Sequence, residues 1–295
     1  MPFSVRRGLI LLVAVLAANP ARSQTTIVFS DDLSSAKQWV YFDPMGVRVT
    51  GGKLLVEDEQ SAIAFFTAPN GGPQSVGVNE SLRVSLTLSL SQPEDSRHGI
   101  RIGLFDSNAA PRPPANTPSA NDGVFQGYDG YLFSWNPAPE EGSNNLTLRY
   151  RTPGGRGDEE ASRALLESLE DTFSRRGVTA GTAPPLTLFE EGVEYKVTYT
   201  ISRGSTNTLE FSLSITGGDV TAFGRTAVVN APSTTDFNAL ALYSDSGASR
   251  FAIDNVLITH TAVPEPSTYA ACAGAVVLGL AFWRRRRATP KAAVA

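Results

Sequence analysis

The sequence is poor in the side chains that most often carry catalysis. Its 295 residues include one cysteine, Cys272, and two histidines, His98 and His260. With a single cysteine the chain cannot form an internal disulfide, and its central region, 24–261, has no thiol nucleophile. Neither histidine has a partner at a spacing typical of metal ligands. Thiol chemistry and a zinc site are therefore not indicated.

Basic residues are scarce in the same central region. The chain has 25 Lys and Arg and 29 Asp and Glu, but eight of the basic residues and only one acidic residue lie in the terminal segments. Region 24–261 therefore carries 17 basic and 28 acidic residues, a net charge of −11. This balance disfavours nucleic acid and anionic membranes as partners. It is compatible with neutral glycans, with cations or simply with solubility.

Long apolar runs are also rare, and the first lies at the N-terminus. Arg6 and Arg7 precede the apolar run 9–18, and Ala21-Arg22-Ser23 forms an A-x-S cleavage site before Gln24. A positive start, a short apolar stretch and small residues at the cleavage point are typical of a secretory signal peptide. We therefore predict that residues 1–23 are a signal peptide and that the chain is exported.

The second apolar run lies close to the C-terminus, at 269–283, and is followed by four arginines, Arg284, Arg285, Arg286 and Arg287. Fifteen residues span roughly 22 Å as a helix, which is short of the ~30 Å hydrocarbon core of a bilayer. The run is rich in Ala and Gly, so we expect a weak transmembrane helix, with the arginines and the tail 288–295 on the cytoplasmic side.

Six residues before this run complete a motif: Val263, Pro264, Glu265, Pro266, Ser267 and Thr268. The order of motif, apolar stretch and arginine cluster over 262–287 resembles the PEP-CTERM sorting signal of Gram-negative bacteria. The resemblance implies recognition by an exosortase, a membrane processing enzyme, and removal of the tail during export. It also implies a place in the cell envelope or extracellular matrix, in bacteria that commonly make exopolysaccharide. The alternative is a plain single-pass anchor.

The region 24–261 is dominated by alternating apolar and polar residues. Leu82, Val84, Leu86, Leu88 and Leu90 share one face of a predicted strand. A hairpin is predicted for 193–203 and 207–216. About a dozen such strands indicate an all-β fold, a sandwich of two antiparallel sheets. One segment, 158–174, has apolar residues at helical spacing and predicts a short inserted helix.

Several segments of this region resemble the concanavalin A-like jelly roll, the sandwich of laminin G domains and legume lectins. The resemblance rests on residues 28–32 with Trp39, on 51–56, on 99–105 and on 251–256. The opening and closing strands are also similar to galactose-binding-like carbohydrate modules. Both resemblances imply a jelly-roll sandwich over 24–261.

The last strand contains an irregularity that suggests a metal site. Its apolar residues change register at Asp254–Asn255, as they do where a strand contains a β-bulge. In similar jelly rolls the first and last strands are neighbours, which would bring Asp31 and Asp32 toward Asp254. Clustered carboxylates suit calcium, so we hypothesise a structural calcium ion there. The alternative is that these carboxylates bond loop amides.

Aromatic residues in 127–136 suggest a sugar site. Tyr128 and Trp135 could stack on the apolar faces of a sugar while Asp129 bonds its hydroxyls. The alternation of Tyr131, Phe133 and Trp135 fits an inward-facing core stripe equally well.

For catalysis the sequence offers no recognisable set of residues. Glycan hydrolases of this fold carry an E-x-D-x-x-E-type strand, and Glu57-Asp58-Glu59 lacks the third carboxylate of that pattern. We therefore predict no catalytic residues and a non-enzymatic, exported protein that contacts polysaccharide. The alternatives are a carbohydrate-active hydrolase and a structural surface protein without a discrete ligand.

Overall fold

The computed structural model describes residues 23–35, 38–41, 46–69, 71–91, 99–108, 112–113, 125, 127–137, 146–151, 165–166, 173–174, 178–180, 189–204, 207–245, 250–263 and 266–287. Contacts divide the chain into two units. One is Thr25–Thr261, and the other combines Met1–Gln24 with Ala262–Ala295. The predicted signal peptide therefore lies outside the described residues, apart from Ser23, which is exposed.

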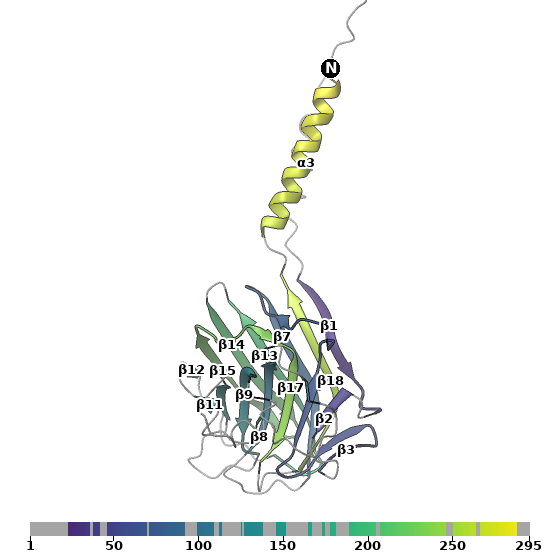
Figure 1. Ribbon diagram of the computed structural model, residues 1–295, viewed down its shortest axis with the longest axis vertical. Helices are drawn as coiled ribbons and strands as arrows, with labels where there is room; N and C mark the ends of the chain where they lie inside the picture. The colour runs from purple at the N-terminus through teal and green to yellow at the C-terminus, as the bar shows by residue number, and fades with distance from the viewer. Residues whose placement is uncertain are drawn as a thin grey trace, which may run out of the picture. The chain divides into compact units, whose positions relative to one another are not determined.

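Unit Thr25–Thr261 contains two large sheets (Figure 1). The nine-stranded sheet has the order β12-β15-β14-β13-β7-β18-β4-β3, and β1 pairs with β18 beside this path. Its strands are β1 (Gln24–Asp31), β3 (Val47–Thr50), β4 (Lys53–Val56), β7 (Ser81–Ser91), β12 (Val178–Ala180), β13 (Glu194–Arg203), β14 (Thr208–Gly217), β15 (Val220–Asn230) and β18 (Arg250–Ala262).

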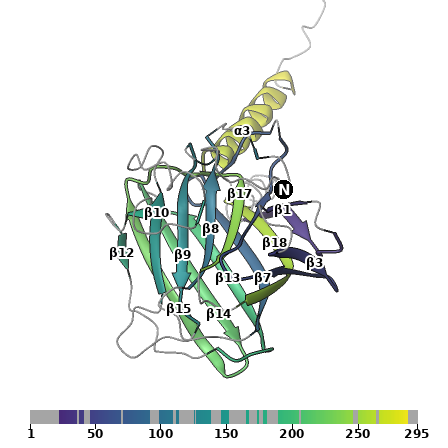
Figure 2. The same cartoon turned by 60° about the horizontal axis from the view of Figure 1, so that its bottom comes forward.

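The seven-stranded sheet forms the second layer and has the order β11-β10-β9-β8-β17-β5-β2 (Figure 2). Its strands are β2 (Trp39–Tyr41), β5 (Ser61–Phe65), β8 (Ile100–Asp106), β9 (Asp129–Trp135), β10 (Leu146–Arg151), β11 (Phe173–Ser174) and β17 (Ala239–Ser244). A small third sheet pairs β6 (Gln74–Ser75) with β16 (Asp236–Phe237). The chain is an antiparallel jelly-roll sandwich, as the sequence predicts.

The main core lies between the two sheets, where alternating side chains meet. On β7 the five predicted apolar residues, from Leu82 to Leu90, are all buried. On β13 the buried set is Tyr195, Val197, Tyr199 and Ile201. The predicted hairpin is the β13–β14 pair, with Lys196 opposite Thr216 and Arg203 opposite Leu209.

A second apolar cluster covers the outer face of the seven-stranded sheet. Along β9, Tyr131 and Phe133 belong to the main core, whereas Leu132 belongs to this second cluster. Because side chains alternate along a strand, the two clusters lie on opposite faces of the sheet. Phe125 and Tyr128 also belong to the outer cluster, together with Leu165, Leu166, Phe105 and Tyr243. The seven-stranded sheet is therefore buried on both faces.

The helix predicted for 158–174 is corrected by the described part of that segment. Leu165 and Leu166 are buried without being helical, and Phe173–Ser174 forms strand β11. This strand pairs with Tyr150 and Arg151 of β10. The edge of a sheet has unpaired backbone N–H and C=O groups, and pairing with them favours an extended conformation for Phe173–Ser174. The remaining residues of the predicted helix lie outside the described ones.

The unit containing the C-terminal segment has one described helix, α3 (Pro266–Arg287). It includes the apolar run 269–283 and the four arginines. None of the helices in the described part of the chain combines the length and apolarity that crossing a membrane requires. Pro264 and Glu265 lie outside the described residues.

Candidate functional site

The three carboxylates of the calcium hypothesis bond backbone amides and a tryptophan. Asp31 is buried; its Oδ1 accepts from the Leu33 N–H at 2.8 Å and its Oδ2 from the Trp39 indole at 2.8 Å. Asp32 accepts from the Ser34 N–H, which lowers the pKa of its carboxyl. Asp254 accepts from the Asn255 N–H at 2.6 Å. Both oxygens of Asp31 therefore have protein partners.

No group of three or more His, Cys, Asp or Glu side chains within the described ranges is placed to hold a metal ion. The hydrogen bonds of Asp31, Asp32 and Asp254 are those of the alternative, in which these carboxylates bond loop amides. A structural calcium ion at these residues stays a prediction. The bulge itself is confirmed. On β7, Thr87 pairs with Asp254 and Ser85 with Leu257, so β18 has one extra residue there. Asn255 accordingly adopts a φ of 52°.

The predicted sugar site at Tyr128, Asp129 and Trp135 is corrected by burial. Tyr128 is fully buried in the outer cluster, and Trp135 is 2% exposed in the main core. Since side chains alternate, Tyr128 and Trp135 lie on opposite faces of the sheet and cannot form one stacking platform. Tyr131 and Phe133 pack against aromatic rings of the opposite sheet, Phe211 and Tyr199. The core-stripe alternative is therefore correct for Tyr131, Phe133 and Trp135.

Asp129 instead belongs to a buried polar group at the start of β9. Its Oδ1 accepts a hydrogen bond from the Ser233 hydroxyl at 2.8 Å. Burial raises the pKa of Asp129 to about 6, from an ordinary value of 3.8. Asp106 of β8 is its direct cross-strand partner, and burial raises the pKa of this carboxyl too. Asp106 and Asp129 therefore lie on the same face of neighbouring strands, and burial makes both carboxyl groups weaker acids.

Buried arginines occupy the outer face of the seven-stranded sheet. Arg101 of β8 forms an ion pair with Asp245, donates to the carbonyl of Leu166 and lies over the ring of Tyr243. Arg151 of β10 is 3% exposed and, among the described residues, donates to the carbonyl oxygens of Leu165 at 3.3 Å and Phe125 at 2.7 Å.

Burial lowers the pKa of Arg151 to about 10, because removal from water disfavours the charged form. Within the described ranges no carboxylate forms an ion pair with Arg151. Arg101 and Arg151 therefore hold the 165–166 segment against the sheet, and Arg101 also contacts a carboxylate, that of Asp245.

Tyr128 and Arg112 complete this face. The hydroxyl of Tyr128 is buried and has no hydrogen-bond partner in the part of the chain that the structure describes. Burial raises the pKa of this phenol, and the charges of Arg112 and Arg151 act in the opposite direction. Arg112 lies over the ring of Phe65, 4.7 Å from its centroid, and donates to Thr67 and to the carbonyl of Ala68. These described partners of Arg112 are neutral.

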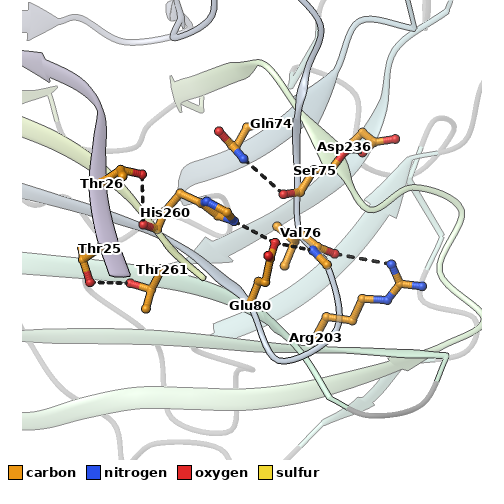
Figure 3. A network of polar contacts seen from close by, with 11 residues as sticks. Thr25, Thr26, Gln74, Ser75, Val76, Glu80, Arg203, Asp236, His260 and Thr261 are labelled. Carbon is orange, nitrogen blue, oxygen red and sulfur yellow. Dashed lines mark hydrogen bonds and ion pairs between the residues drawn. The ribbon is translucent and has the colours of Figure 1, made fainter. Parts of the chain in front are cut away.

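The end of β18 is tied to its neighbours by a separate polar network (Figure 3). The His260 ring lies 3.0 Å from the Glu80 carboxylate, which also accepts from the Gly77 N–H. On the other side, the hydroxyls of Thr25 and Thr261 are 3.0 Å apart, which joins β1 to β18. His260 is thus part of a structural contact, and His98 lies outside the described residues.

Glu57, which belongs to the incomplete carboxylate pattern, and Glu194 also have structural partners. Glu57 accepts from Arg48 at 2.9 Å and from Arg250 at 2.9 Å. Glu194 pairs with Lys53 at 2.8 Å. Sequence reasoning missed Arg101, Arg151 and Asp106, because a charged residue within an alternating strand usually faces solvent. The cover that buries them comes from distant segments.

Comparison with known proteins places a sorting signal at the C-terminus. Residues 262–287 match the PEP-CTERM protein-sorting motif. The chain therefore carries the signal that its proline motif, apolar run and arginines predicted. No curated protein sequence matches the chain.

Several solved structures are similar to this chain at low sequence identity. The exoplasmic/lumenal domain of VIP36, in a form bound to Ca²⁺ and Man3GlcNAc, is 10% identical, with a TM-score of 0.46 over 80% of this chain and 89% of that one. Arcelin-5, a lectin-like defence protein from Phaseolus vulgaris, is 10% identical, with a TM-score of 0.45 over 82% and 99%. A mutant of alginate lyase Aly36B bound to an alginate tetrasaccharide is 12% identical, with a TM-score of 0.42 over 82% and 97%.

Proposed function

We propose that this chain is an exported, non-enzymatic protein that an exosortase-type membrane enzyme recognises through residues 262–287. The jelly-roll unit then acts in the cell envelope or extracellular matrix by contacting polysaccharide. The observation that carries the proposal is the sorting motif, joined to a sandwich that has no cysteine. Polysaccharide is the partner that the sorting signal implies, and the excess of acidic residues disfavours nucleic acid.

The contacts of the described ionisable residues support a binding or structural role. His260, Glu57 and Glu194 each have a protein partner that fixes the side chain. Such groups would have to leave these partners before they could serve as an acid or a base. A surface that contacts polysaccharide needs no proton transfer and is compatible with this arrangement.

A carbohydrate-active hydrolase is the second candidate, and one observation favours it. Asp106 and Asp129 are direct cross-strand partners, and the pKa of about 6 for Asp129 suits a proton donor near neutral pH. Against this, the two residues are 7% and 3% exposed, and Asp129 is held by Ser233. A glycosidic bond would have to enter a buried space between them, so binding without hydrolysis is the better reading.

The sorting proposal is tested by removing the signal. Deletion of 263–295 should abolish processing and leave the protein unsorted, because the motif and the arginines are both lost. Deletion of 288–295 alone is the matched control and should change nothing, since the matched motif ends at residue 287. If the protein lacking 263–295 were retained and processed like the native chain, the sorting role would be refuted.

The second test separates binding from hydrolysis. The full chain is applied to a glycan array and incubated with the same glycans in a reducing-end assay. We expect retention on one or more polysaccharides without release of reducing ends. If reducing ends were released, and if Asp129→Asn abolished this release, the hydrolase candidate would replace the binding one.

A further inference from the structure

The outer face of the nine-stranded sheet consists mainly of short side chains with hydroxyl groups. On its adjacent strands β7, β13 and β14 (Figure 1), sixteen side chains point away from the core, and twelve of them are Ser or Thr. All sixteen are at least partly exposed. Threonine favours strands, but serine does not belong to the residues that do. Strand propensity therefore leaves the serines of this face unexplained.

Six of these residues form a regular array, which we call the hydroxyl face. It takes two residues from each of the three strands: Ser85, Thr87, Thr198, Thr200, Ser212 and Ser214. Thr198 lies directly opposite both Ser85 and Ser214, and Thr200 lies opposite Ser212. Neighbouring strands are about 4.8 Å apart and alternate residues of one strand about 6.8 Å apart, so the hydroxyl groups repeat in two directions. None of the six hydroxyls has a protein partner within the described residues.

The surroundings of the hydroxyl face are electrically balanced, although the domain is acidic. The charged residues among the outward positions of these strands are two bases and two acids: Arg83, Lys196, Glu194 and Glu210. Region 24–261 has a net charge of −11, so the excess of acidic residues lies elsewhere. An acidic polymer is repelled by the domain as a whole and meets no compensating positive patch here.

The composition of this face distinguishes between kinds of partner. Protein interfaces are enriched in aromatic residues, Met and Arg and are depleted in Ser. The outward positions of β7, β13 and β14 hold no aromatic or large aliphatic side chain, so they offer little apolar area to a second protein or to lipid. A neutral polysaccharide presents repeated hydroxyls, and each Ser or Thr hydroxyl can both donate to and accept from them.

We propose that the hydroxyl face binds a neutral polysaccharide that lies across β7, β13 and β14. The inference rests on the proposed contact with polysaccharide and adds to it the surface and the class of sugar. Because the side chains are short, a sugar chain can approach the sheet closely and contact all three strands at once. A single neutral hydrogen bond contributes little, so the affinity should come from many contacts and rise with the length of the sugar chain.

Binding of the full chain to paired polymers tests the class of sugar. Hydroxyethylcellulose and carboxymethylcellulose form one pair, and dextran and carboxymethyl dextran form another, because the members of a pair share a backbone and differ in charge. We expect the neutral member of at least one pair to bind at least about tenfold more tightly than its carboxylated partner. Glucose at the same concentration of sugar units should not displace the protein, since one unit cannot span several strands.

Two double variants test the position of the site. Thr198→Val with Thr200→Val removes two hydroxyls of the hydroxyl face and keeps the branched shape that suits a strand. This variant should bind the neutral polymer about tenfold more weakly, because the loss of one hydrogen bond lowers an affinity about two- to tenfold. Thermal denaturation should show that it remains folded.

The matched control removes two hydroxyls from the other sheet. Thr147 and Ser134 are direct cross-strand partners on β10 and β9, and both are partly exposed. Leu146 and Leu148 point into the main core, so Thr147 lies on the opposite side of its strand, away from that core. Thr147→Val with Ser134→Ala should bind the neutral polymer within about twofold of the native chain.

The outcomes distinguish this inference from the broader proposal. Equal or tighter binding of the carboxylated polymers would overturn the neutral class, and native affinity in the Thr198→Val, Thr200→Val variant would overturn the hydroxyl face as the site. Both results leave the contact with polysaccharide standing. If sedimentation showed a dimer that this variant dissociates, the face would be an interface between copies of the chain, and the inference would be wrong. If no glycan of any kind bound to the full chain, both the hydroxyl face as a sugar site and the proposed contact with polysaccharide would be refuted.

Discussion

Replacement of Asp129 by asparagine should remove a pH-dependent cost to the stability of the fold. Asp129 is 3% exposed, and its pKa in the folded chain is about 6, compared with an ordinary value of 3.8. The folded chain therefore holds this proton more tightly than the unfolded chain does. Stability from this group is fully present below pH 3.8 and is lost as the pH rises through 6.

The size of the effect follows from the two pKa values. A difference of one pKa unit corresponds to 1.36 kcal/mol, so ionised Asp129 costs about 3 kcal/mol at pH 8. Most of this cost, roughly 2 kcal/mol, should disappear by pH 4, where the folded carboxyl is protonated. The advantage of Asp129→Asn over the native chain should therefore be about 2 kcal/mol larger at pH 8 than at pH 4.

The assay is urea denaturation of the native and variant chains at both pH values. The comparison uses the difference between pH values, so any new contact of the asparagine amide cancels. Asp32→Asn is the control: Asp32 is exposed and the Ser34 N–H lowers its pKa, which gives its pH dependence the opposite sign. If Asp129→Asn shifted stability equally at pH 4 and pH 8, the carboxyl would not be the buried, weakened acid described above.

Two further substitutions test the packing that positions the site. Gly130→Ala should lower the free energy of unfolding by about 1–3 kcal/mol, because the new Cβ would overlap the carbonyl oxygen of Leu104. Gly72→Ala is the control, since a Cβ at Gly72 meets open space. An equal loss of stability in both variants would contradict the close approach of the strands at Gly130. At the bulge, Asn255→Val should lower the free energy of unfolding by about 1–2 kcal/mol while Asn255→Gly lowers it little, since the residue has a φ of 52°. Thermal denaturation should therefore give a lower melting temperature for the valine variant. Equal melting temperatures for the two variants would argue against the left-handed conformation.

The sequence predicted those features that depend on local patterns. Alternation along 82–90 located β7 and its inward face, and the turn between 203 and 207 located the β13–β14 hairpin. The register change at Asp254–Asn255 correctly predicted the bulge. Each of these predictions follows from the two-residue alternation of side chains along a strand, which can be recognised from neighbouring residues alone.

The candidate site was harder to predict because distant segments create it. Arg101 and Arg151 occupy polar positions of alternating strands, and such positions ordinarily face solvent. They are buried because Phe125 and Leu165–Leu166 cover the outer face. The local sequence around each arginine does not predict contact with these distant segments. The same cover buries Tyr128, which sequence reasoning had placed in an exposed sugar site.

The two ends of the sandwich coincide with the two predicted processing points. Strand β1 begins at Gln24, directly after the predicted signal-peptide cleavage point, and β18 ends at Ala262, directly before the sorting motif. The contact of Thr25 with Thr261 joins these two strand ends. Because both predicted points lie outside Thr25–Thr261, we expect the β1–β18 pair to be present in the processed protein.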